Sequence, residues 1–72
     1  MNDSIDLDVS GFMEEGDFDG QGRTFDAACE DAWQKAKKPP HNHGPGWYKV
    51  KHQWVYMENP VSEHKVIIGP AG

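Results

Sequence analysis

One helix is specified by the sequence at both ends and along one face, and it constrains what the rest of the chain can form. Its apolar residues recur at the 3.6-residue spacing of a helix lying on a core, at Phe25, Ala28, Cys29, Ala32, Trp33 and Ala36. Thr24 stands at the N-cap position, and Pro39-Pro40 prevents the helix from continuing. We therefore expect a helix over about residues 25–37, against which every other element must pack.

The chain has 72 residues and one cysteine, which is enough for a single small domain without an intrachain disulfide. A core of this size seldom contributes more than about 3–5 kcal/mol, so oligomerisation is the expected additional support. There is no apolar run of 18 residues and no basic signal start. We expect a soluble protein of the cytoplasm that is not bound to a membrane.

The net charge of −5 is divided unevenly along the chain. Residues 1–31 carry ten acids and one arginine, whereas residues 32–72 carry six lysines and two acids. An acidic chain with one arginine is a poor nucleic-acid binder, because such binding depends on many cationic contacts to phosphates. The polarity suits head-to-tail contacts between copies or a charged partner, but a plain solvated surface is the favoured explanation.

Three further segments have the pattern of strands. Residues 4–10 alternate polar and apolar, residues 47–57 are aromatic and β-branched, and residues 62–68 end at Gly69-Pro70. The resulting order is β-α-β-β, an α+β fold in which one helix packs on one face of a three-stranded antiparallel sheet. Alternation within the second strand predicts one set of side chains beneath the helix: Tyr48, Val50, His52, Trp54 and Tyr56.

Two loops contain possible metal ligands. Residues 14–23 are rich in glycine and acid and indicate an exposed acidic loop, in which Asp17 and Asp19 have the spacing that opens a calcium-binding loop. The twelfth position of that pattern is Ala28 rather than the required glutamate, so a plain acidic loop is favoured. His41 and His43 follow the helix in a breaker-rich connection, where two exposed histidines are more common than a metal site. We therefore predict no metal site.

The sequence offers little support for catalysis. Cys29 lies on the apolar stripe of the helix, where a cysteine behaves as a buried, inert side chain. His52 and His64 could meet across neighbouring strands, but no nucleophile or paired acid accompanies them. We predict no catalytic residues and no enzyme.

Three segments together resemble the dodecin family, of which this chain would be a divergent member. They are the helix Thr24–Ala36, the tetrapeptide Trp47-Tyr48-Lys49-Val50, and the closing strand His64–Gly69. The resemblance implies a hollow dodecamer in which flavins stack in pairs between symmetry-related tryptophans and are stored and quenched. It places Lys65 where the family has a flavin-holding glutamine. The acidic loop 14–23 is an insertion, and the turn at residues 58–61 is short for the family.

We therefore expect a non-catalytic homo-oligomer that binds a flavin or another planar ligand at subunit junctions, with the dodecamer as the assembly that the resemblance implies. Trp47, Val55 and Lys65 are the candidate ligand-binding residues, with Trp47 as the stacking surface. Trp47 could instead fill an oligomer interface, where tryptophan is enriched. The alternative function is a bacterial or phage accessory or assembly protein that binds another macromolecule through its oligomeric surface.

Overall fold

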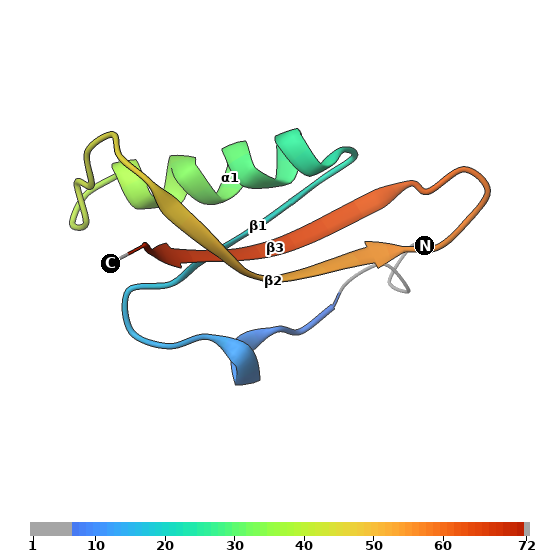
Figure 1. The fold of residues 1–72 in the computed structure, drawn as a ribbon, viewed down its shortest axis with the longest axis horizontal. Helices are drawn as coiled ribbons and strands as arrows, with labels where there is room; N and C mark the ends of the chain where they lie inside the picture. Colours follow the sequence, from blue (N-terminus) through green and yellow to red (C-terminus); the bar gives the residue numbers. More distant parts are fainter. Residues whose placement is uncertain (1–6, 72) are drawn as a thin grey trace.

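The computed structural model describes residues 7–71, in which one helix packs on one face of a three-stranded sheet (Figure 1). The edge strands are β1 (Phe18–Gly22) and β2 (Tyr48–Tyr56), and β3 (Glu63–Pro70) lies between them. Both edge strands are antiparallel to β3. The helix α1 (Phe25–Lys37) connects β1 to β2, which run in the same direction and therefore need a crossover connection. The α+β class and the β-α-β-β order are as expected.

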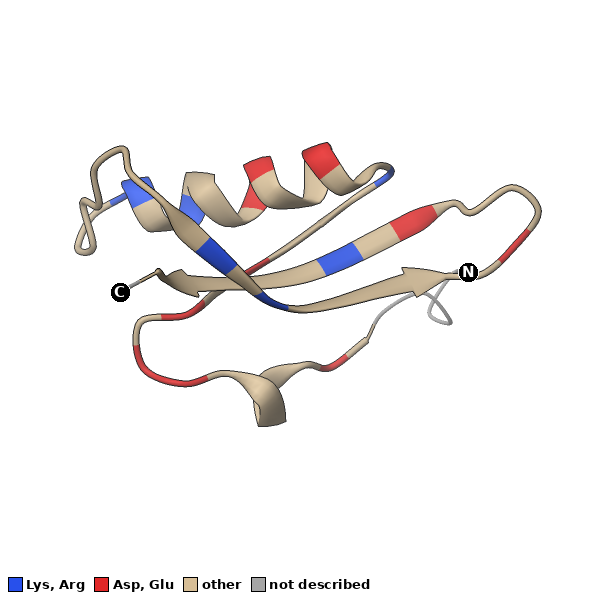
Figure 2. Ribbon diagram, viewed as in Figure 1, with Lys and Arg blue, Asp and Glu red and all other residues tan. Residues whose placement is uncertain are grey.

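The helix α1 has the bounds that its sequence predicts. The Thr24 hydroxyl accepts a hydrogen bond from the Ala27 backbone N–H at 3.0 Å, which satisfies a donor that the helix itself cannot pair. Acids occupy the first half of α1 and lysines its last turns, which complements the helix dipole (Figure 2). Its small-residue stripe is fully buried, at Ala28, Ala32 and Ala36.

The first strand is not where the sequence pattern placed it. Residues 4–6 of the expected strand 4–10 lie outside the described residues, and Leu7–Val9 form no strand. The chain continues into a short 3-10 helix, η2 (Ser10–Phe12). The strand β1 instead occupies residues 18–22, within the segment 14–23 that was expected to be an acidic loop. Both expectations are therefore corrected.

The glycines of β1 explain why its sequence resembles a loop. A Cβ atom at Gly20 would collide with the backbone of Ala28 and Ala32, and one at Gly22 would lie 2.7 Å from the Ala27 Cβ atom. Glycine here permits close approach of a strand to the small-residue stripe of α1, a role that glycine also has in strands. The glycine content therefore reflects helix–sheet packing rather than a turn.

A β-bulge at Lys51 divides β2 into two parts, and alternate side chains that point toward the helix before the bulge point away from it after the bulge. The register with β3 shifts between Val50 and His52, so that Lys51 has no partner on β3. Val50 lies opposite Ile68, which packs in the core beneath α1, whereas His52 lies opposite Ile67 on the other face. Since directly opposed residues point to the same side of a sheet, the sequence-based facing holds only before the bulge. Beyond it, His52, Trp54 and Tyr56 face away from the helix, which corrects the prediction for these three residues.

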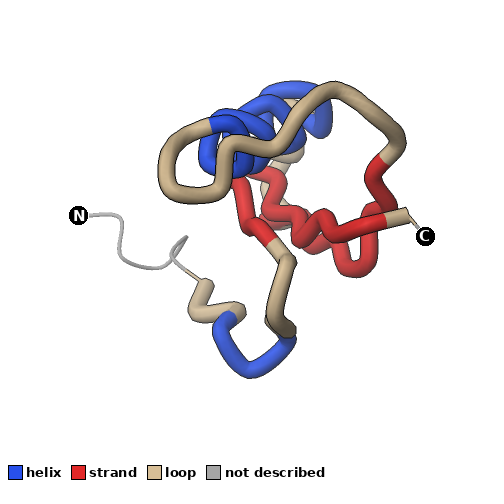
Figure 3. Tube along the Cα trace, turned by 90° about the vertical axis from the view of Figure 1, so that its left-hand side faces the viewer, coloured by secondary structure: helices blue, strands red, loops and turns tan. Residues whose placement is uncertain are grey.

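The segment that precedes β1 covers the face of the sheet away from α1 (Figures 1 and 3). The ring of Phe12 lies 5.2 Å, between centroids, from the rings of both His52 and Trp54. Val9 is buried, and Ile67 of the central strand has no exposed surface. The sheet thus lies between the helix and the N-terminal segment.

Candidate functional site

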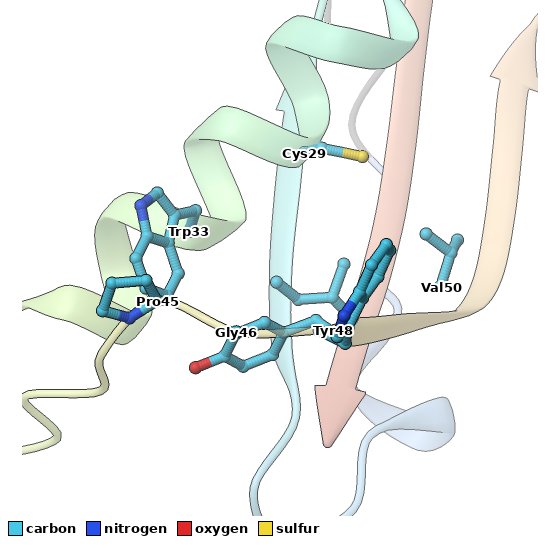
Figure 4. A pocket seen from close by; sticks show the side chains of 8 residues that line it. Cys29, Trp33, Pro45, Gly46, Tyr48 and Val50 are labelled. Atoms are coloured by element: carbon cyan, nitrogen blue, oxygen red, sulfur yellow. The ribbon is translucent and has the colours of Figure 1, made fainter. Parts of the chain in front are cut away.

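An open groove lies between α1 and the start of β2, where the helix leaves the edge strand uncovered (Figure 4). We call it the α1–β2 groove; its volume is about 460 Å³. Its lining is mostly apolar or aromatic and comprises Cys29, Trp33, Pro45, Gly46, Trp47, Tyr48, Val50 and Ile68. This volume is within the range of pockets that hold small organic ligands.

Two aromatic side chains form a wall of the groove, and Figure 4 shows them on α1 and β2. The rings of Trp33 and Tyr48 lie 5.4 Å apart between centroids, with an interplanar angle of 59°. The Tyr48 hydroxyl donates a hydrogen bond to the Gly44 carbonyl oxygen at 3.1 Å, which ties the loop before β2 to the strand. The wall is therefore held by contacts between the helix, the loop and the strand.

Trp47 stands at the mouth of this groove with 91% of its surface exposed. An indole exposed to this extent offers both faces to a planar ring. The sequence singled out Trp47, but it assigned Trp33 and Tyr48 to the core. The sequence did contain a signal for this site. Trp33 lies in the second half of α1, and Trp47 and Tyr48 directly follow Pro45-Gly46 in the connection that brings the end of α1 near the start of β2.

The other two candidate ligand-binding residues lie elsewhere in the chain. Val55 stands opposite His64 near the far end of β2, and 42% of its surface is exposed. Lys65 lies on the face away from α1, where it donates a hydrogen bond to the Gln21 side chain at 3.2 Å. Neither residue lines the α1–β2 groove, so the structure does not bring Trp47, Val55 and Lys65 together within one chain.

The three residues considered for catalysis are not arranged for it: Cys29 is disfavoured as a nucleophile, and His52 and His64 lie on opposite faces of the sheet. Burial, with a smaller contribution from Asp26, raises the pKa of the Cys29 thiol, which disfavours the thiolate. His52 stacks on Trp54 away from the helix, whereas His64 lies opposite Val55 on the other face. His64 has a buried Nδ1 atom without a hydrogen-bond partner in the described part of the chain. The two histidines therefore do not meet across the strands.

The metal-ligand candidates are engaged in other contacts. The rings of His41 and His43 meet the ring of Phe18 edge-on, with centroid distances of 4.9 and 5.4 Å. Asp17 and Asp19 form ion pairs with lysines instead of facing a common point. Within residues 7–71 there is no cluster of three or more His, Cys, Asp or Glu side chains suited to a metal ion.

Asp17 forms a buried ion pair that fastens the N-terminal segment to β2. Its carboxylate lies 3.0 Å from the Lys51 ammonium and accepts a hydrogen bond from the Glu14 N–H at 2.9 Å. Burial raises the pKa of Asp17, but the Glu14 N–H and the Lys51 ammonium outweigh it, so the pKa lies below its ordinary value. Hydrogen bonds to Glu14 and Asp17 raise the pKa of Lys51. The bulge thus places a lysine where it pairs with a buried acid, which is a structural role.

No protein-family model, curated protein or solved structure matches this chain. None of the helices in the described residues is long and apolar enough to cross a membrane.

Proposed function

We propose that this protein is a non-catalytic, homo-oligomeric binding protein of the cytoplasm that holds a planar ligand in the α1–β2 groove. A flavin is the first ligand to test, in keeping with the resemblance to dodecins. The observation that carries the proposal is the exposed indole of Trp47 beside an open groove walled by Trp33 and Tyr48.

The lining of the groove favours recognition by stacking and shape. Stacking of a base on an aromatic side chain contributes about 1–3 kcal/mol, and it is available to any planar ring system. The Cys29 thiol is the one titratable group among the lining residues besides the Tyr48 phenol, and burial favours its protonated form. A ligand in this groove would therefore be bound rather than transformed.

Titration of riboflavin and FMN with the purified protein tests this proposal. We expect saturable quenching of flavin fluorescence, because a ring stacked on an indole loses its emission. Trp47→Ala should weaken binding by about tenfold or more, since one stacking contact is lost. Val61→Ala, which removes an exposed apolar side chain outside the groove, is the matched control and should leave binding unchanged. Absence of quenching by the wild-type protein would rule out the flavin.

A second candidate function is that of a bacterial or phage accessory protein that binds another macromolecule. The observation that favours it is a row of exposed apolar residues along β2 and just beyond it, at Val50, Val55 and Met57. Exposed apolar residues that follow one another along a strand are typical of a surface that contacts another macromolecule. Binding of a macromolecular partner that is lost in Met57→Glu and retained in Trp47→Ala would favour this function over the small-molecule one.

A further inference from the structure

The outer edge of β2 is open in the described part of the chain. β2 is an edge strand of nine residues, and among the described strands β3 is its one neighbour. Edge strands of this length are commonly protected or used for pairing with another chain. Toward the helix side the strand and its extension expose Val50 by 40%, Val55 by 42% and Met57 by 70%. From Tyr48 to Val55 the outer edge of β2 therefore pairs with no other strand of residues 7–71, and uncovered apolar side chains lie along it.

We propose that two copies of this chain pair antiparallel through the outer edges of their β2 strands, about a two-fold axis at Trp54, to form one six-stranded sheet. This interface specifies the homo-oligomerisation that is part of the proposed function and rests on it. The partner is a second copy because the surface is complementary to itself, as an interface across a two-fold axis requires.

The bulge at Lys51 determines which residues would face each other. Because Lys51 occupies no position in the ladder, an axis at Trp54 places Val50 opposite Met57 of the second copy. Both are exposed apolar residues, so the pairing covers them on the helix side. Gln53 would lie opposite Val55 of the second copy on the same side. Cross-strand pairs of this kind are the unit of sheet stabilisation.

The other face of the paired strands is matched in the same register. His52 would lie opposite Tyr56 of the second copy, and Trp54 opposite its own symmetry mate. Aromatic residues opposed across strands stabilise a sheet, so both pairs are favourable. A slip of one residue would oppose side chains from different faces. A slip of two residues keeps the facing but separates Val50 from Met57 and Lys49 from Glu58, so these two pairs select the register.

Charge complementarity is the observation that decides for a second copy. The same register places Lys49 opposite Glu58 of the second copy, and by symmetry this pair occurs twice. Within residues 7–71 no salt bridge involves either side chain, and both residues are exposed. The Glu58 carboxylate accepts a hydrogen bond from the Ser62 hydroxyl at 3.2 Å, which leaves its charge unpaired. Each chain thus contributes a lysine to one ion pair and a glutamate to the other, at opposite ends of its edge strand.

Pairing would also complete the α1–β2 groove. Val50 lines the groove, and Met57 of the second copy would extend this wall from across the two-fold axis. Each groove would then be built from residues of both copies.

A charge-swap experiment tests the interface, with molar mass measured by light scattering over a range of concentrations. The wild-type chain should form dimers or larger assemblies. Lys49→Glu and Glu58→Lys should each weaken the dimer by about tenfold, because like charges then face each other at two places. The double variant should restore the wild-type mass. Lys38→Glu makes the same charge change in the loop after α1 and is the matched control.

Each result decides a separate point. A wild-type monomer at every concentration would overturn both this interface and the homo-oligomer of the proposed function. Single variants with the wild-type mass, or a double variant that stays weakened while its far-UV circular dichroism is native, would overturn the interface alone. Flavin quenching by a monomeric variant would show that the groove binds its ligand independently, so failure of the interface is distinguishable from failure of the ligand proposal.

Discussion

At the scale of single residues, Asp17 depends most on its surroundings. Its side chain has no exposed surface, and its charge is balanced by Lys51 and by the Glu14 N–H. A buried carboxylate without such partners would be strongly unfavourable. Gly69 leaves the space for it, because a Cβ atom there would lie 2.5 Å from the Asp17 Oδ1 atom. Three segments far apart in the sequence thus meet at one carboxylate.

The lowered pKa of Asp17 predicts that the protein loses stability in acid. The pKa in the folded chain lies below the ordinary value of 3.8, so the stabilisation is complete above that pH. It is lost as the pH falls through the lower, folded-state pKa. Asp17→Asn should cost about 1–3 kcal/mol at neutral pH and flatten the acid limb of the stability profile.

Urea unfolding measured from about pH 2 to about pH 7 would check this, because that range lies on both sides of the ordinary pKa of an aspartate. Glu15→Gln, at an exposed position, is the control and should follow the wild-type curve. An Asp17→Asn protein with unchanged acid sensitivity would contradict the assignment.

At the scale of elements, the contact between α1 and β1 is made possible by residues without bulk on both sides. Ala28 and Ala32 have no exposed surface, and Gly20 lies directly beneath their backbone. The helix also covers the outer edge of β1, since the Asp31 carboxylate accepts a hydrogen bond from the Gln21 N–H at 3.0 Å. One edge of the sheet is thereby protected by the helix, whereas no strand within residues 7–71 pairs with the outer edge of β2.

Gly20→Ala should destabilise the protein because its Cβ atom would meet backbone atoms, which cannot move aside as a side chain can. Overpacking of this kind costs about 1–3 kcal/mol. Thermal unfolding followed by circular dichroism measures the loss. Gly44→Ala provides the comparison, since a Cβ atom there meets nothing within 4 Å. Equal melting temperatures for the two variants would show that α1 and β1 are not packed so closely.

At the scale of the whole molecule, β3 is the element on which both layers depend. Val66 and Ile68 pack toward α1, and Ile67 faces the N-terminal segment, with almost no exposed surface among them. The charge polarity of the sequence is also partly neutralised at this scale. Acids of the first half pair with lysines of the second within one chain, as Asp17 does with Lys51 and Asp19 with Lys35.

Ile67→Ala should leave the chain largely unfolded. Truncation of a fully buried isoleucine costs about 2–5 kcal/mol, and a core of this size supplies only about 3–5 kcal/mol in total. Far-UV circular dichroism and urea unfolding at one protein concentration would measure the loss. The exposed Val61 serves for comparison, and Val61→Ala should remain folded. A cooperative, near-native Ile67→Ala transition would mean that the N-terminal segment contributes little to the core.

The sequence by itself determined the features that depend on neighbours along the chain. The bounds of α1 follow from an N-cap, an apolar period and two prolines, all of which act within a few residues of the helix. The strands β2 and β3 follow from local composition, and with the helix they establish the α+β class. Trp47 was also identifiable, because an aromatic residue beside a turn stands out without knowledge of its contacts.

Tertiary structure alone decided the features that depend on residues distant in sequence. The segment 18–22 is a strand because its glycines lie beneath the alanines of α1, a contact that local composition cannot reveal. The facing of Trp54 was reversed by the bulge at Lys51, which exists only in the register with β3. The α1–β2 groove likewise exists because α1 does not cover the start of β2. Trp33, Trp47 and Tyr48 line this groove together, whereas Val55 and Lys65 lie outside it. Local rules act over a few residues, whereas each of these features joins segments that meet only in the folded chain.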